Sequence, residues 1–168
     1  MSEPQNIQAY LNNFFSRNKL NIKNQLKAIV TAGPTKEYID PIRYITNKSS
    51  GKQGFEIAKA LNKRGIKTTL ITGPTKLESP KNLNTIKVDS ADQMFLETKK
   101  NLPADIAVCS AAVSDFKILN YKKNKIKKDM KVNLEIEKNV DILSYLSTHN
   151  SLRPKLVIGF AAETNDVL

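Results

Sequence analysis

The chain has 168 residues, enough for about one domain, and carries 27 Lys and Arg residues against 16 Asp and Glu, a formal net charge of +11 at pH 7. Its hydrophobic content of 40% argues against wholesale disorder, and its single cysteine excludes an internal disulfide framework and a cysteine-cluster metal site. The basic excess favours an anionic partner: nucleic acid, a membrane surface or a phosphorylated small molecule.

No apolar run approaches the ~20 residues that a membrane-spanning helix needs. The N-terminus, MSEPQNIQAYLNNFF, has no basic segment followed by an apolar core, so we expect no signal peptide. The lone Cys109 is compatible with a reducing compartment. We therefore expect a cytoplasmic protein that does not bind membranes.

The first 27 residues are polar and rich in asparagine. Apolar residues recur there at helical spacing, which predicts a short amphipathic helix followed by a linker: Ile7, Tyr10, Leu11, Phe14 and Phe15. Nothing in this segment suggests chemistry. We expect the domain itself to occupy residues 28–168.

From Ala28 the pattern alternates between strands and helices. The expected strands cover residues 28–32, 68–72, 85–88, 105–110 and 155–160. The expected helices cover 51–64, 90–102 with a Ser90–Gln93 capping box, and a segment that begins at Asn139 or Asp141 and ends near 147. This succession predicts an α/β, doubly wound, Rossmann-like and mostly parallel sheet, with ligands at the carboxyl ends of its strands.

Residues 121–137 interrupt the alternation. Val132, Leu134 and Ile136 alternate with polar residues, which predicts a half-exposed strand, and a run of lysines precedes them. We expect a basic β flap that protrudes from the sheet edge. Charge alone leaves two interpretations open: a solvated or nucleic-acid-binding face, or an active-site flap that neutralises a polyphosphate.

The loop after the first strand is the first candidate site. It contains neither a Walker A motif, since Thr46 occupies the position of the required glycine, nor a GxGxxG fingerprint. What remains is Ser49-Ser50-Gly51 at a helix start, which suits a phosphate but is also what an ordinary helix N-cap looks like.

Other single residues point less clearly to a role. Asp115 follows a buried strand, where a carboxylate binds a ribose hydroxyl or Mg²⁺, or simply caps a turn. Cys109 is expected to be a buried, inert thiol and His149 to be a surface residue. Asp40 and Arg43 are placed to pair and brace the first loop, and a direct role at the substrate stays open.

Four blocks together carry more information than any one of them. TAGPTKEYIDPIRYITNKSSGKQGFEIA, AAVSDF, KIKK and RPKLVIGFAAET, in this order and spacing, resemble the phosphopantothenoylcysteine synthetase (phosphopantothenate–cysteine ligase) domain. In bacteria that domain is commonly the C-terminal half of a bifunctional coenzyme A biosynthesis protein. The blocks run from about Ala28 to the end of the chain.

The resemblance implies a reaction, its ligands and its assembly. CTP would activate the carboxylate of 4′-phosphopantothenate as an acyl-cytidylate with release of pyrophosphate, and the amine of L-cysteine would then attack to form an amide and CMP. Mg²⁺ and lysines would neutralise charge on the phosphates, and bound geometry would position the weak nucleophile. The resemblance further implies a homodimer or a larger assembly, and no nucleic-acid partner.

The resemblance also implies residue roles. Asn47 would handle the acyl-cytidylate, and Lys125 or Lys128 would take part in the chemistry. Asp115 would also lie near the metal. The nucleotide would contact Gly33, Ser49, Ser50, Gly51, Asp115, Phe116, Lys125, Lys127, Lys128, Phe160 and Ala161, with the flap lysines reaching the triphosphate across a dimer interface.

The chain departs from the family pattern at three places. Pro34 stands in a usual Gly-Gly-Thr, and residues 138–141 read KNVD in place of Lys-Thr-Pro-Asp. Members of the family continue well past GFAAET, whereas this sequence ends at Leu168. The alternative expectation is therefore an inactive or split-gene fragment that binds nucleotide, or a partner chain carrying the C-terminal segment or a decarboxylase domain.

Overall fold

The computed structural model describes residues 4–17, 26–128, 131–149 and 151–162. A five-stranded parallel sheet forms its centre, in the order β5-β4-β1-β6-β9. The strands are β1 (Lys27–Ala32), β4 (Lys67–Thr72), β5 (Asn84–Lys87), β6 (Ile106–Cys109) and β9 (Leu156–Gly159). The predicted α/β, Rossmann-like fold is confirmed, and the observed strands match the predicted ones within about two residues.

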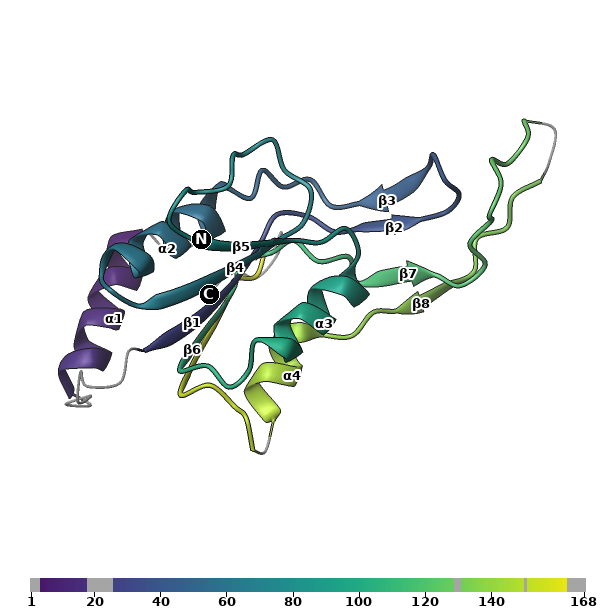
Figure 1. Ribbon diagram of the computed structural model, residues 1–168. Helices are drawn as coiled ribbons and strands as arrows, with labels where there is room; N and C mark the ends of the chain where they lie inside the picture. Colours follow the sequence, from purple (N-terminus) through teal and green to yellow (C-terminus); the bar gives the residue numbers. More distant parts are fainter. Residues whose placement is uncertain (1–3, 18–25, 129–130, 150, 163–168) are drawn as a thin grey trace.

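Helices cover both faces of the sheet, as the alternation predicts (Figure 1). On one face, Val30, Leu70 and Val108 pack with α2 (Lys52–Lys63) and with Leu11 of α1 (Pro4–Arg17). On the other, Ile29 and Ile71 pack against α3 (Ala91–Lys100) and α4 (Ile142–Thr148). Successive residues of one strand thus enter different cores, which explains the continuous apolar runs. The side chains of Phe14 and Phe15 lie outside the described part.

The helix starts agree with the sequence at α3 and α4 and differ from it at α2. Ser90 and Gln93 form the predicted capping box of α3, and Asp141, one of two candidates, caps α4. At α2 the N-cap is Gly51, in the left-handed region with φ 74°, and no side chain caps the helix. The simple N-cap interpretation of Ser49 and Ser50 is therefore wrong.

Two antiparallel ribbons extend from the carboxyl edge of the sheet (Figure 1). The first, β2 (Lys36–Tyr38) with β3 (Tyr44–Thr46), was not predicted. The second joins β7 (Phe116–Ile118) to β8 (Ile136–Lys138). The predicted strand is too long, since β8 includes Ile136 but neither Val132 nor Leu134. The regular ladder ends because the side chain of Asn120 takes over the contacts to Asn133 O and Glu135 N.

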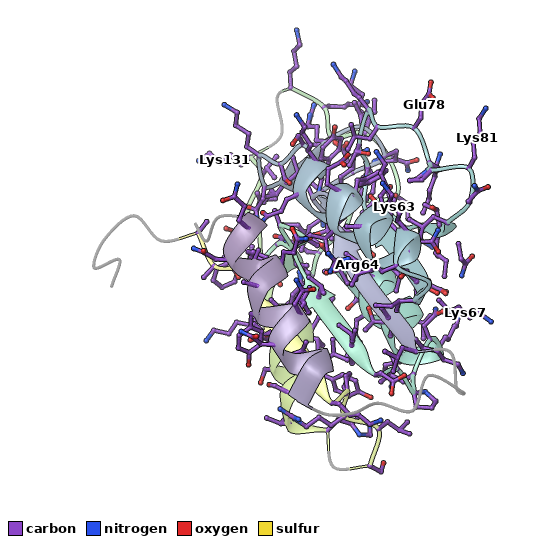
Figure 2. The ribbon with its side chains drawn as sticks, turned by 90° about the vertical axis from the view of Figure 1, so that its left-hand side faces the viewer. Lys63, Arg64, Lys67, Glu78, Lys81 and Lys131 are labelled. Atoms are coloured by element: carbon purple, nitrogen blue, oxygen red, sulfur yellow. The ribbon has the colours of Figure 1, made fainter. Side chains whose placement is uncertain are left out.

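The positive charge of the protein is spread over its surface. Figure 2 shows Lys63, Lys67, Lys81 and Lys131 pointing outward from separate parts of the molecule. A solvated surface accounts for these lysines. Among the described residues, no helix is both long and apolar enough to cross a membrane.

Candidate functional site

Three glycines bring the first loops of the sheet into direct contact. A Cβ atom on Gly51 would lie 3.2 Å from the Cα of Gly33 and 2.8 Å from Thr75 Cγ2, and one on Gly73 would lie 1.6 Å from the carbonyl oxygen of Pro34. The ends of β1 and β4 and the start of α2 therefore meet with no room for side chains. Gly33 and Gly51, two predicted nucleotide contacts, are neighbours here.

The start of α2 is suited to an anion. The Oγ atoms of Ser49 and Ser50 accept from the main-chain N–H groups of Gly51 (3.3 Å) and Lys52 (3.4 Å), which fixes the turn. The first turn of the helix contains no acidic residue. Since the partial positive charge at this helix end is not offset by a carboxylate from the helix itself, a phosphate would be favoured there.

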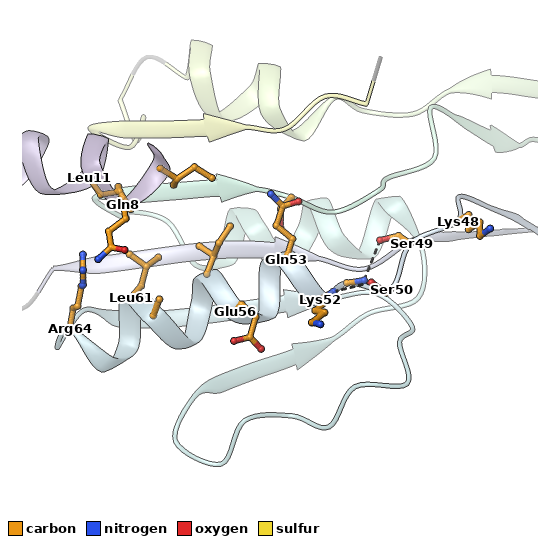
Figure 3. Close-up of a pocket in the computed structure, with 15 residues that line it drawn as sticks. Gln8, Leu11, Lys48, Ser49, Ser50, Lys52, Gln53, Glu56, Leu61 and Arg64 are labelled. Carbon is orange, nitrogen blue, oxygen red and sulfur yellow. Dashed lines mark hydrogen bonds between the residues drawn. The ribbon is translucent and has the colours of Figure 1, made fainter. Parts of the chain in front are cut away.

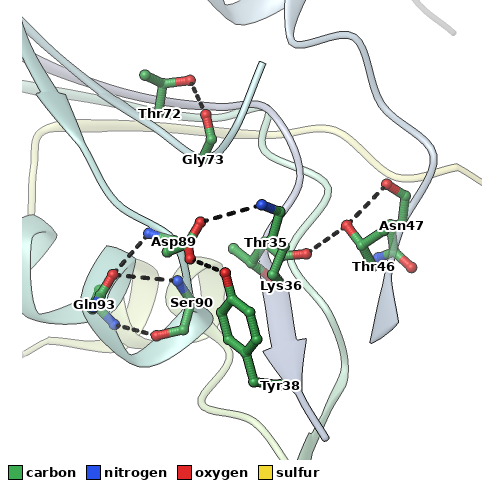
Figure 4. A network of polar contacts seen from close by, with 10 residues as sticks. All are labelled: Thr35, Lys36, Tyr38, Thr46, Asn47, Thr72, Gly73, Asp89, Ser90 and Gln93. Carbon is green, nitrogen blue, oxygen red and sulfur yellow. Dashed lines mark hydrogen bonds and ion pairs between the residues drawn. The ribbon is translucent and has the colours of Figure 1, made fainter. Parts of the chain in front are cut away.

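Asn47 connects this turn to the loop after β6. Its side-chain Nδ2 donates to the carbonyl oxygens of Val113 (2.9 Å) and Ala112 (3.4 Å). The neighbouring Thr46 hydroxyl donates to Thr35 O at 2.7 Å (Figure 4). Two of the sequence blocks that carry the family resemblance are thus joined through Asn47.

The loop after β6 is itself held from two sides. Ser114 N donates to the buried Thr35 Oγ1 at 2.9 Å, and Asn139 Nδ2 donates to Ser114 O at 2.8 Å. Asn139 N also donates to Asp115 O at 2.8 Å. Asp115 and Phe116, which follow shortly after the Ala112 and Val113 carbonyls that Asn47 binds, have exposed side chains. Both side chains are therefore accessible to a ligand.

The base of the β2–β3 ribbon is anchored on α3. The Tyr38 hydroxyl donates to the carboxylate of Asp89, and this hydrogen bond is the main reason that the pKa of Tyr38 is raised to about 12. Lys36 Nζ lies 3.7 Å from the carboxylate of Asp89 (Figure 4). Glu37 accepts a hydrogen bond from Ala91 N at 3.0 Å. Burial raises the pKa of Glu37. The ribbon that leads to Asn47 is therefore rigidly attached to the domain.

The flap lysines are not part of this cluster within one chain. Lys125, Lys127 and Lys128 are exposed. The segment that carries them, between β7 and β8, runs beyond the tip of the β2–β3 ribbon and away from the start of α2 (Figure 1). At the other end of the site, Phe160 N donates to Cys109 O at 3.1 Å, and Ala161 is exposed. Phe160 and Ala161 therefore lie at the carboxyl edge of the sheet, and their contact with a nucleotide stays a prediction.

A cavity of about 900 Å³ adjoins the serine turn (Figure 3). Its wall is largely apolar, with Ile57 and Leu61 from α2 and Ile7 and Leu11 from α1, and Ser49 to Gly51 close one end. The sequence assigned α1 no part in a site, because its apolar spacing only indicated packing. The structure places it beside the candidate phosphate turn.

Two other candidate residues have structural roles. Cys109 is half-buried and not fully buried as predicted, and burial raises the pKa of its thiol to about 12, so the thiol is protonated at neutral pH. His149 Nδ1 accepts from the main-chain N–H groups of Ser151 (3.3 Å) and Leu152 (3.0 Å), and the residue is half-buried, not a plain surface side chain.

A sequence model of the DNA/pantothenate metabolism flavoprotein C-terminal domain matches residues 23–168. The chain belongs to this family. It is 45% identical over 172 residues to the coenzyme A biosynthesis bifunctional protein CoaBC of Haemophilus influenzae, covering 99% of this chain and 42% of that protein. It is 38% identical over 153 residues to the Escherichia coli protein of the same name, covering 88% and 37%. The chain thus spans about two fifths of the curated relatives it matches.

Solved structures agree with the family assignment. The C-terminal domain of a CoaBC protein superposes with a TM-score of 0.72 at 36% identity, over 84% of this chain and 67% of that one. A DNA/pantothenate metabolism flavoprotein from Streptococcus pneumoniae gives 0.65 at 27% identity, over 78% and 67%. A Cab2 mutant in complex with phosphopantothenate-cysteine gives 0.67 at 17% identity, which shows a shared fold only.

In this pantothenate metabolism flavoprotein domain, the structure brings together most of the predicted site. Gly33, Ser49 to Gly51, Asn47 and the 112–116 loop converge at one edge of the sheet. Within the described ranges, no three His, Cys, Asp or Glu side chains gather into a metal site, so Asp115 belongs to no such group. The residues that sequence reasoning missed, Thr35 and Asn139, act through main-chain contacts and have no spacing signal.

Proposed function

We propose that this domain catalyses the CTP-dependent ligation of 4′-phosphopantothenate to L-cysteine through an acyl-cytidylate. One observation carries the proposal: in a chain 45% identical to a CoaBC protein, Asn47 joins the serine turn of α2 to the loop that ends in Asp115. Formation of the acyl-cytidylate and its attack by cysteine both need a phosphate site next to an acyl site. The Asn47 contact joins the two segments that are the candidates for these sites.

The phosphates of the nucleotide are assigned to the start of α2. The hydroxyl groups of Ser49 and Ser50, whose oxygens accept from Gly51 N and Lys52 N, can still donate to a phosphate, and the helix dipole favours negative charge there. Phe160 and Ala161 would face the base from the end of β9, and Phe116, whose ring is exposed, is a further candidate contact to the nucleotide. CTP is the nucleotide that we propose; the geometry of these residues suits ATP as well.

A bound Mg²⁺ would neutralise phosphate charge while the acyl-cytidylate forms. Asp115 is the residue that would hold it, and the exposed carboxylate fits an ion that arrives with the nucleotide and takes its other ligands from phosphates and water. The amide of Asn47 would position the reacting acyl group: one N–H holds Val113 O at 2.9 Å, and the other, in a long contact of 3.4 Å to Ala112 O, would turn to an oxygen on which negative charge develops.

Lys125, Lys127 and Lys128 would act on the nucleotide of a second copy of the chain. The segment that carries them, residues 122–128, lies beyond the β2–β3 ribbon, far from the α2 turn of its own chain (Figure 1). The β7–β8 ribbon, whose connecting segment carries these lysines, and the neighbouring β2–β3 turn expose large apolar side chains, as an interface between subunits requires: Ile42, Phe116, Leu119, Tyr121 and Ile136. We therefore propose a homodimer in which each site is completed by the partner's flap. A cytoplasmic location and the absence of a nucleic-acid partner stay predictions of the sequence.

The test is an assay with phosphopantothenate, L-cysteine, Mg²⁺ and either CTP or ATP, in which pyrophosphate and product are measured separately. We expect both to form with CTP. Pyrophosphate release that depends on phosphopantothenate, without ligated product, would mean that the chain activates the acid but does not complete the reaction. If the folded protein shows neither product nor a CTP-dependent rise in Tm, the proposal is wrong.

A further inference from the structure

The lysine segment, residues 122–128, is attached at its start by a hydrogen bond from Lys122 N to Ile39 O at 2.9 Å, and further along by one buried side chain, Ile126. Its lysines are exposed, whereas the side chain of Ile126 is only 7% exposed. The segment has no regular secondary structure, so no ladder of main-chain hydrogen bonds holds it. The contacts that hold Ile126 in place therefore determine the direction in which the side chains of Lys125 and Lys127 project.

Asp40, in the turn between β2 and β3, supplies that fixation. Its side chain is 0% exposed. One carboxylate oxygen accepts from the main-chain N–H groups of Ile42 and Arg43, each at 2.8 Å, and the other accepts from Ile126 N at 3.2 Å. The carboxylate thus bridges its own turn and a residue 86 positions later in the chain.

Arg43 binds both Asp40 and the main-chain carbonyl of Ile126. Its Nη1 lies 3.2 Å from Asp40 Oδ2, and its Nη2 donates to Ile126 O at 3.1 Å. Both main-chain polar groups of Ile126 are therefore bound by one ion pair. Burial works to raise the pKa of Asp40, but the three N–H donors and the Arg43 charge outweigh it, so the pKa is lowered and the carboxylate stays charged at neutral pH.

We propose that Asp40 is a positioning residue which, together with Arg43, clamps Ile126 and thereby fixes the lysines on either side of it. The ordinary alternative is that Asp40 only stabilises the β2–β3 turn through its bonds to Ile42 and Arg43. If Asp40 clamps Ile126, loss of the carboxylate should loosen residues 122–128 in particular. If Asp40 only stabilises the turn, it should not. This inference rests on the proposed function only for the purpose that the lysines serve.

The first experiment measures the segment itself and needs no enzymatic activity. Asp40→Asn is compared with Glu137→Gln, the same chemical change in the exposed Lys117–Glu137 ion pair at the base of the β7–β8 ribbon. Both proteins are digested briefly with trypsin, and cleavage after each lysine is followed by mass spectrometry. We expect cleavage within residues 122–128 to be about tenfold faster in Asp40→Asn, and unchanged in Glu137→Gln.

A role confined to the turn would give a different result. In that case Asp40→Asn would lower Tm and speed cleavage throughout the protein, with no preference for residues 122–128, and the clamp would be refuted. If Asp40→Asn does not fold, Arg43→Gln takes its place, because it leaves the turn's main-chain bonds to Asp40 intact and removes the contact to Ile126 O. Unchanged cleavage at 122–128 in that variant would equally refute the clamp.

A second experiment separates this inference from the proposed function. In the ligase assay, Asp40→Asn is expected to raise the KM for CTP about tenfold, and Glu137→Gln to leave it unchanged. Faster cleavage of the segment in a protein with no ligase activity would uphold the clamp and overturn the function. Normal KM and normal cleavage in an active enzyme would overturn the clamp alone.

Discussion

The side-chain amide of Asn47 donates to the main-chain carbonyl of Val113 at 2.9 Å, across 66 positions of sequence. This contact joins the turn before α2 to the loop after β6, so two motifs that follow different strands are held in a fixed position relative to each other. A neutral amide is required, because its partners Val113 O and Ala112 O are both acceptors.

Asn47→Asp is the direct test of that contact. The introduced carboxylate would face two carbonyl oxygens that it cannot bind, so we expect it to turn away and release the 112–113 segment. Ligated product should fall about 100-fold, the scale associated with one well-placed catalytic donor. Folding should be weakened by about 1–3 kcal/mol. Both quantities are measurable, by product assay and by urea unfolding.

The control is Asn84→Asp, since Asn84 also donates from Nδ2, to Thr69 Oγ1 at 3.2 Å, but lies on the edge strand β5. It should leave product formation unchanged. Equal losses in the two variants would show that Asn47 has no special place in the reaction.

Gly51→Ala should harm the site through crowding as well as through backbone strain. The residue has φ 74°, and its added Cβ would lie 2.8 Å from Thr75 Cγ2 and 3.2 Å from Gly33. Gly65→Ala is a matched control, since Gly65 has φ 81° and nothing lies within 4 Å of an added Cβ. Strain alone is worth about 1–2 kcal/mol in both variants.

We therefore expect Gly51→Ala to lower Tm by several degrees more than Gly65→Ala. Only Gly51→Ala should weaken the stabilisation of the protein by CTP, because only its turn belongs to the candidate phosphate site. Thermal unfolding of both variants with and without CTP measures the two effects. Equal CTP shifts would remove the α2 turn from the nucleotide site.

Two buried carboxylates should give the stability curve opposite slopes at acid pH. Burial raises the pKa of Glu37 above 4.5, so the folded protein keeps that proton longer than the unfolded chain, and stability falls as pH rises from about 4.5. The pKa of Asp40 is lowered, so its contribution is present above pH 3.8 and is lost as pH falls through its folded pKa.

Urea unfolding between pH 3 and pH 7 can separate the two. Glu37→Gln keeps an acceptor for Ala91 N and should remove the decline above pH 4.5. Asp40→Asn should flatten the acid side below pH 3.8. Glu56→Gln, in an exposed pair with Lys59, serves as the control and should reproduce the wild-type curve. A Glu37→Gln curve parallel to wild type would contradict the assignment.

The sheet could be predicted from the sequence because each strand is a short apolar run between turn signals, and the helices show their own period. The β2–β3 ribbon could not, since Lys36 to Tyr38 is partly polar and its turn is closed by Asp40 and not by an Asn-Gly pair. The ribbon is stabilised by the contacts of Tyr38 with Asp89 and of Glu37 with Ala91, at the start of α3. Each contact joins residues more than 50 positions apart in the sequence.

The candidate site was predictable in its residues but not in its arrangement. Spacing placed Ser49 to Gly51 and Asp115 after neighbouring strands, and the parallel sheet necessarily puts such ends at one edge. That Asn47 bridges them, and that the flap lysines lie outside the cluster, depends on the direction in which the two ribbons leave the sheet. No local pattern encodes that direction.

The position of the flap leads to a complementation test of the shared site. Asn47→Asp and the triple variant Lys125→Ala, Lys127→Ala, Lys128→Ala should each be inactive alone. If each site combines Asn47 of one subunit with lysines of the other, a mixed dimer has one site with both defects and one intact site. Random re-association of equal amounts gives half mixed dimers, so the activity should recover to about a quarter of wild type.

The recovery must depend on subunit exchange. Mixing should restore activity only after the dimers are dissociated and re-formed, and size-exclusion chromatography should show a dimer throughout. Recovery absent from verified mixed dimers would mean that the lysines serve the nucleotide of their own chain. That result would require the segment beyond the β2–β3 ribbon to fold back by a large distance, which the Asp40–Ile126 contact at 3.2 Å opposes.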